Sequence, residues 1–198
     1  MSTGIDIEFI RENYQRMSND ELMKIATQDA FGLTPAALEV VKEEIRKRNL
    51  DTNVIKGLEL QNRTLSIQEI DYYCSLLQKL DCPKCGGTSQ NLNGTLTSEV
   101  ISFVIVSQHH RKLKVACPIC LDKLSNAALT KTLLFGWWGI PWGVVRTIQA
   151  IGHYAKAIKQ HHVNAPNIYL KNFVLQNIGE IETYKDKTLQ LQEIIATG

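Results

Sequence analysis

The chain of 198 residues contains no long apolar run. Its longest uninterrupted apolar stretch, Leu133 to Val145, has 13 residues. A membrane-spanning helix needs about 20. Three glycines and Pro141 lie within or beside this stretch and would interrupt a helix. The sequence therefore argues against a simple transmembrane crossing.

Signatures of the common enzyme classes are also missing. We find no G-x-x-x-x-G-K-[ST], no G-x-G-x-x-G after a strand, no H-E-x-x-H and no G-x-S-x-G. The zinc-deaminase signature is absent, because proline lies inside each cysteine pair and not before it. We therefore expect no enzyme, no catalytic residue and no small-molecule substrate.

No export signal is recognisable at the N-terminus. Residues Met1 to Phe9 have neither a basic head nor a long apolar stretch, so we expect a cytoplasmic protein. Its five cysteines should then stay reduced. This favours metal binding over disulfide formation.

Acidic residues are missing from Lys123 to Gly179. Residues 100–179 carry nine basic residues against the single acid Asp122, whereas residues 1–99 carry 11 basic and 15 acidic residues. A basic segment without acids favours an anionic partner such as phospholipid, nucleic acid or an acidic protein. Alternatively, the acidic N-terminal part folds onto the basic middle and neutralises it.

Helical patterns occupy the first 80 residues. Residues 5–17 have helical periodicity, "SNDE" from Ser18 is a capping box, and Thr34-Pro35 supplies an N-cap followed by proline. This third helix should bury Leu38, Val41 and Ile45. A second capping box, "SIQE" from Ser66, begins a helix that reaches about Leu80.

The middle of the chain changes to strand patterns. Residues 99–107 and 111–116 are rich in β-branched residues and predict two strands, and Asn93-Gly94 predicts a turn. Helical patterns return at residues 121–129, 144–159 and 181–195, the last as one polar helix. We therefore expect an α+β fold, mainly helical with a small central zinc-ribbon β-sheet. Its predicted segments are a helical N-terminal module (1–80), a zinc ribbon (81–130), and a Trp-rich turn with C-terminal helices (131–198).

The cysteines give the strongest signal. Cys82 and Cys85 form one C-x-x-C pair, and Cys117 and Cys120 form a second after 31 intervening residues. Two cysteines three positions apart on a tight turn can both face one ion. Two such pairs flanking strands predict one structural Zn²⁺ bound by four thiolates. Such a site has no open coordination position, so its role would be stability.

Two resemblances accompany this pattern. C-P-K-C-G and C-P-I-C resemble the knuckles of zinc-ribbon proteins, and together with the downstream G-W-W-G-I-P-W-G they look like a group of small bacterial zinc-ribbon proteins. Residues 17–50 are similar to a short helical module found ahead of varied bacterial domains, which implies an adaptor or regulatory protein. A single C-P-x-C at a helix start also resembles the redox turn of glutaredoxin-like enzymes. The second pair and the lack of a preceding βαβ pattern argue against that resemblance.

All three tryptophans, Trp137, Trp138 and Trp142, lie in the G-W-W-G-I-P-W-G segment. As a tight turn, this segment can pack its indoles in a core or against a partner. As an exposed turn, it can lie at a bilayer interface, with Arg146 and nearby lysines beside lipid phosphates. We favour packing in a core or against a partner.

These observations predict a non-catalytic, zinc-stabilised binding protein. Its basic, Trp-rich surface, formed by Trp137, Trp138, Trp142, Arg146, Arg111 and Lys112, would engage a protein partner, and an immunity or antitoxin protein that blocks a toxin is one such case. One alternative is a peripheral protein of the inner membrane, anchored by the tryptophan turn on an anionic surface. The other is a nucleic-acid-binding ribbon that uses the "HHRKLK" run, predicted to lie at the strand turn.

Overall fold

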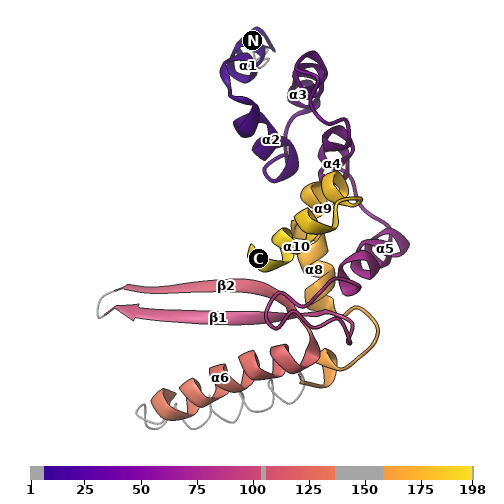
Figure 1. Cartoon of the computed structure of the whole chain (residues 1–198). Coiled ribbons are helices and arrows are strands. Elements are labelled where there is room, and N and C mark those ends of the chain that lie inside the picture. Colours follow the sequence, from indigo (N-terminus) through magenta and orange to yellow (C-terminus); the bar gives the residue numbers. More distant parts are fainter. Residues whose placement is uncertain (1–6, 104–105, 137–157, 198) are drawn as a thin grey trace. The chain divides into compact units, whose positions relative to one another are not determined.

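The computed structural model describes residues 7–103, 106–136 and 158–197 (Figure 1). It is mainly helical with one two-stranded antiparallel sheet, which confirms the α+β fold class. The chain divides into two compact units. Unit 1 contains residues 1–69 and 176–191, and unit 2 contains residues 70–175 and 192–198.

Unit 1 is helical, and local sequence signals set the start of its helices. Ser18 and Glu21 form the predicted capping box, in which each residue's side chain bonds the other's backbone amide. Thr34 caps the next helix and Pro35 is its first residue, as predicted. The helices of this unit are α1 (Ile7–Arg16), α2 (Asn19–Thr27), α3 (Pro35–Lys47), α4 (Asn53–Gln61) and α9 (Ile178–Tyr184).

Aliphatic side chains from α2, α3 and α4 and the α2–α3 loop form the core of unit 1. Val41 and Ile45 are fully buried, as predicted, and Leu38 is half-buried against the same cluster. The buried cluster consists of Leu22, Ala26, Ala30, Val41, Ile45, Val54 and Leu58. Burying each valine, leucine or isoleucine side chain of this cluster contributes about 1.5–3 kcal/mol relative to exposure.

Arg48 fixes the end of α1. Its guanidinium donates to the backbone carbonyls of Tyr14 (2.9 Å) and Met17 (2.7 Å), and Glu44 holds the same guanidinium at 2.7 Å. The last carbonyls of a helix have no partner within the helix. Arg48 therefore supplies donors to the C-terminal end of α1, and this basic residue has a structural role.

Helices α4 and α9 approach each other closely through two glycines. A Cβ atom on Gly57 would lie 2.4 Å from the Gly179 carbonyl oxygen, and one on Gly179 would lie 2.2 Å from the Thr27 carbonyl oxygen. Gln61 spans the same region, donating to the Ala26 carbonyl (2.8 Å) and accepting from the Ala30 amide (3.2 Å). Helix α9 thus completes a unit whose other helices lie more than a hundred residues earlier in the chain.

Unit 2 is built around a hairpin whose strands are β1 (Asn93–Phe103) and β2 (Val106–Ala116). Asn93 pairs with Ala116 and Phe103 pairs with Val106, so two strands are present as predicted. The bounds of the first differ from the predicted 99–107, because β1 ends at Phe103 and residues 106–107 belong to β2. The run His109 to Lys114 lies inside β2, so its predicted place at the strand turn is wrong. Helix α6 (Pro118–Gly136) runs along the hairpin (Figure 1). Unit 2 also contains most of α5 (Ile67–Gln78), α8 (Ile168–Gln176) and the end of α10 (Thr188–Thr197).

Two buried asparagines attach the start of β1 to the segment before α8. The Asn167 side chain donates to the Gly94 carbonyl (2.7 Å) and accepts from the amides of Gly94 (3.3 Å) and Leu170 (2.9 Å). In return, Asn93 accepts from the Asn167 amide at 2.9 Å. The predicted Asn93-Gly94 turn is therefore wrong. Gly94 is needed because a Cβ there would lie 2.4 Å from the Leu170 nitrogen.

Replacing Asn167 with alanine should destabilise unit 2 by about 3 kcal/mol, because buried donors and acceptors lose their partners. Chemical denaturation of the purified variant measures this. Asn164→Ala is the matched control, since Asn164 is exposed and receives a bond from Gln78 only through its backbone carbonyl. Equal stability of the two variants would contradict the prediction.

The C-terminal region differs from the expected single polar helix over 181–195. Two helices, α9 and α10, are separated at Lys185 to Lys187. They bury Ile181, Leu191 and Ile195. Many glutamine, glutamate and threonine residues lie between these buried positions. This polar composition led to the prediction of one polar helix in place of two short helices.

Candidate metal centre

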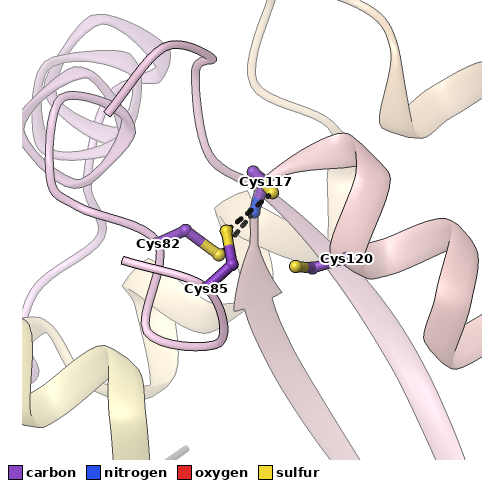
Figure 2. Close-up of side chains that lie close together, drawn as sticks. All are labelled: Cys82, Cys85, Cys117 and Cys120. Atoms are coloured by element: carbon purple, nitrogen blue, oxygen red, sulfur yellow. Dashed lines mark hydrogen bonds between the residues drawn. The ribbon is translucent and has the colours of Figure 1, made fainter. Parts of the chain in front are cut away.

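The first cysteine pair lies on a loop between α5 and β1. Its turn is closed by two backbone hydrogen bonds, from the Gly86 amide to the Cys82 carbonyl (2.8 Å) and from the Cys82 amide to the Gly87 carbonyl (3.0 Å). Gly86 has a φ of 68°, a conformation that favours glycine. The turn therefore presents the side chains of Cys82 and Cys85 to the same space (Figure 2).

The second pair has a different local structure from the predicted tight turn. Cys117 follows the end of β2, and Cys120 lies in the first turn of α6, which begins at Pro118. Proline is favoured at the first helical position because the amide hydrogen that it lacks would have no partner within the helix there. Residues three apart on a helix share a face, so the helix start brings both sulfurs to one side. A helix N-terminus also stabilises negatively charged groups such as thiolates.

All four side chains converge (Figure 2). The sulfurs of Cys82, Cys85, Cys117 and Cys120 all lie within 4.8 Å of one another. Those of Cys85 and Cys117, from different pairs, are 3.8 Å apart. Cys85 is exposed, whereas the other three are buried. Four sulfur donors at these separations can hold a metal ion.

The surroundings already favour a thiolate at Cys82. Burial raises the pKa of its thiol, but hydrogen bonds from nearby backbone amides outweigh this effect and lower the pKa to about 7. One of these donors is the Cys117 amide, 3.3 Å from the Cys82 sulfur. At Cys120, burial and the neighbouring sulfurs raise the pKa to about 12. A bound cation would favour the ionised form of the whole set.

Cys74 does not belong to this cluster. It is fully buried in α5, where desolvation, and then the nearby Asp71, raise its pKa to about 12. A thiol in such surroundings behaves as a small apolar side chain. The fifth cysteine is therefore part of the packing of unit 2.

A second polar cluster includes Asp122, close in the chain to Cys120, and no sequence motif indicates it. Asp122 follows Cys120 by two residues, and its two carboxylate oxygens contact His161 Nδ1 (2.9 Å) and His162 Nε2 (2.7 Å). His161 is fully buried, and its Nε2 lies 3.2 Å from the Thr95 hydroxyl. Partial burial raises the pKa of Asp122, but the two histidine hydrogen bonds outweigh this and lower it. The cluster thus joins β1, α6 and the segment after residue 158.

Replacing Asp122 with alanine should destabilise unit 2 by about 2 kcal/mol, because the buried His161 ring loses a hydrogen-bond partner. His162→Ala is the matched control, since the His162 side chain is half exposed and should contribute little. Denaturation of both variants tests the prediction. A larger loss in His162→Ala would contradict it.

The other predicted site residues are not brought together by the part of the chain that the structure describes. Arg111 and Lys112 are consecutive residues of β2, paired with Ser98 and Thr97. The remaining four, Trp137, Trp138, Trp142 and Arg146, lie outside the described residues.

Within the described ranges, no helix is both long and apolar enough to cross a membrane. In those same ranges, the four cysteines are the one group of three or more His, Cys, Asp or Glu residues whose ligand atoms lie close enough together to hold one metal ion. In comparisons with known proteins, no family model, no curated protein and no solved structure matches the chain.

Proposed function

We propose that this protein is a non-catalytic binding protein whose unit 2 is stabilised by one zinc ion bound to Cys82, Cys85, Cys117 and Cys120. The observation that carries the proposal is the convergence of four sulfurs within 4.8 Å from two separate C-x-x-C pairs. A four-sulfur set is typical of zinc or of iron. Two C-P-x-C pairs separated by a hairpin are typical of structural zinc.

The donor set supports a structural role. Catalytic zinc sites keep one position open for water or substrate, whereas four thiolates fill a tetrahedral site. The ion would hold the first loop to the junction between β2 and α6. Zinc binding in small modules contributes about 10 kcal/mol, comparable to the stability of a whole domain.

The charge of unit 2 supports an acidic protein as the partner. Its residues, 70–175 and 192–198, include 11 basic and five acidic residues. One of these acids, Asp122, already has its carboxylate hydrogen-bonded to two histidines. Lys84, Lys123 and Lys159 are exposed. A unit with a net basic charge of this kind favours acidic partners and speeds their association. A toxin blocked by an immunity-type protein is one such partner.

Metal analysis of the purified protein tests the first half of the proposal. We expect one zinc per chain, and none in a variant in which Cys82 and Cys117 are both replaced by serine. Iron in place of zinc, or a folded wild-type protein without metal, would contradict this half.

Affinity capture from the native host tests the second half. We expect an acidic protein that no longer binds when Lys84 and Lys123 are both replaced by glutamate, while Lys24→Glu, an exposed change in unit 1, leaves binding intact. The same proteins are incubated with anionic lipid vesicles and with duplex DNA or RNA. Binding to vesicles or nucleic acid, with no protein captured, would replace the proposed partner with a membrane or nucleic acid.

A further inference from the structure

The four cysteines differ in how accessible they are. Cys82, Cys117 and Cys120 are buried, whereas Cys85 is exposed. An oxidant arriving from solvent therefore reaches Cys85 before the three buried cysteines. Thiolate character and exposure together determine which cysteine is oxidised.

The Cys85 sulfur lies close to a sulfur of the opposite pair. It lies 3.8 Å from that of Cys117, and a disulfide needs about 2.05 Å. No atom lies within 4 Å of a Cβ built on Gly86, so the side of the turn next to Cys85 is open. The turn that carries both Cys82 and Cys85 is closed by backbone bonds at 2.8 and 3.0 Å, so the approach to Cys117 is made by the Cys85 side chain.

From this arrangement, and resting on the zinc site proposed above, we infer that Cys85 is a peroxide-modified site whose oxidation forms a Cys85–Cys117 disulfide and releases the zinc. The Cys85 thiolate attacks a peroxide oxygen, which breaks the O–O bond. Sulfur loses two electrons and becomes a sulfenic acid, and the peroxide is reduced to water or an alcohol. The Cys117 thiolate then attacks the Cys85 sulfur, forms the S–S bond and displaces hydroxide, which is protonated to water.

Loss of two ligands frees the metal. Cys82 and Cys120 alone leave half of a tetrahedral site unfilled, so zinc should dissociate. A dithiol reductant reverses the step by donating two electrons to the disulfide and becoming a disulfide itself. Unit 2 would then regain its metal when zinc is present.

Tryptic mapping of the zinc-loaded protein tests the inference. Cleavage after Lys84 separates Cys82 from Cys85, because the peptide 80–84 contains Cys82 and the peptide 85–111 contains Cys85. Cys117 and Cys120 share the peptide 115–123. After equimolar hydrogen peroxide, we expect the peptides 85–111 and 115–123 to be cross-linked, and fragmentation to place the bond at Cys117. A chromogenic chelator should record close to one zinc released per chain, and dithiothreitol with added zinc should restore the site.

Controls separate the possible failures. Dimedone added with the peroxide should label Cys85 in the wild-type protein, a readout that does not depend on any variant folding. Cys74→Ala should behave as the wild type, since Cys74 lies outside the cluster. A first disulfide between Cys82 and Cys85 or between Cys117 and Cys120, or zinc retained under peroxide, would overturn the inference. Zinc is measured before peroxide is added, so a metal-free starting protein would instead overturn the proposed zinc site.

Discussion

Removing zinc is expected to unfold the hairpin region of unit 2 and to leave the helices of unit 1 folded. Zinc modules gain about 10 kcal/mol from the metal, and a whole domain has a stability of only about 5–15 kcal/mol. No disulfide joins the loop that carries Cys82 to the start of α6, because none of the five cysteines forms one. Unit 1 has its own buried core and contains no cysteine, so it does not depend on the metal.

Hydrogen exchange measured by mass spectrometry resolves this prediction by region. After treatment with a strong chelator, peptides covering β1, β2 and the start of α6 should lose protection, and peptides covering α2, α3 and α4 should keep it. Cys117→Ser should reproduce the chelator result, whereas Cys74→Ala should not. Unchanged protection of the hairpin in metal-free protein would show that the metal does not stabilise unit 2.

Gly179→Ala is expected to destabilise unit 1 by about 3 kcal/mol, at the upper end of the range for overpacked cores. The added methyl would lie 2.2 Å from the backbone carbonyl oxygen of Thr27 and 2.1 Å from the side-chain nitrogen Nε2 of Gln61. Backbone cannot move away as the end of a flexible side chain can. A loss of stability in Gly179→Ala would indicate a crowded position. In an open helix alanine is favoured over glycine by about 1 kcal/mol, so the same change would stabilise the protein.

Thermal and chemical denaturation of the Gly179→Ala protein measure this loss. Lys56→Ala is the control, since Lys56 is exposed on the partner helix α4. Gly57→Ala should behave like Gly179→Ala, because its methyl would lie 2.4 Å from the Gly179 carbonyl oxygen. A stabilised Gly179→Ala protein would mean that α4 and α9 are not in this close contact.

Features encoded by neighbouring residues could be predicted from the sequence. The capping residues Ser18, Thr34 and Ser66 act within three residues of their partners. The cysteine pairs also have short spacings, so their convergence could be expected from C-x-x-C alone. Even so, the second pair lies on a helix start and not on a tight turn, because α6 begins at Pro118, three residues before the predicted helix start at residue 121.

Features that depend on distant residues could not be predicted. Asn93-Gly94 has the composition of a turn, but its actual role depends on Asn167, more than 70 residues later. The Asp122 cluster likewise joins residues about 40 positions apart. A single acid in a basic segment and a pair of histidines carry no local pattern that would connect them.

The division of the chain has a consequence during protein synthesis. Helix α9, which packs against α4, is encoded after the whole of residues 70–175. While the ribosome is still synthesising residues 70–175, α4 is present, but α9, which packs against it near Gly57, is not. Unit 1 therefore cannot complete its fold in the order in which its residues emerge, and the N-terminal helices must wait for the four-cysteine segment to be translated before their last neighbour arrives.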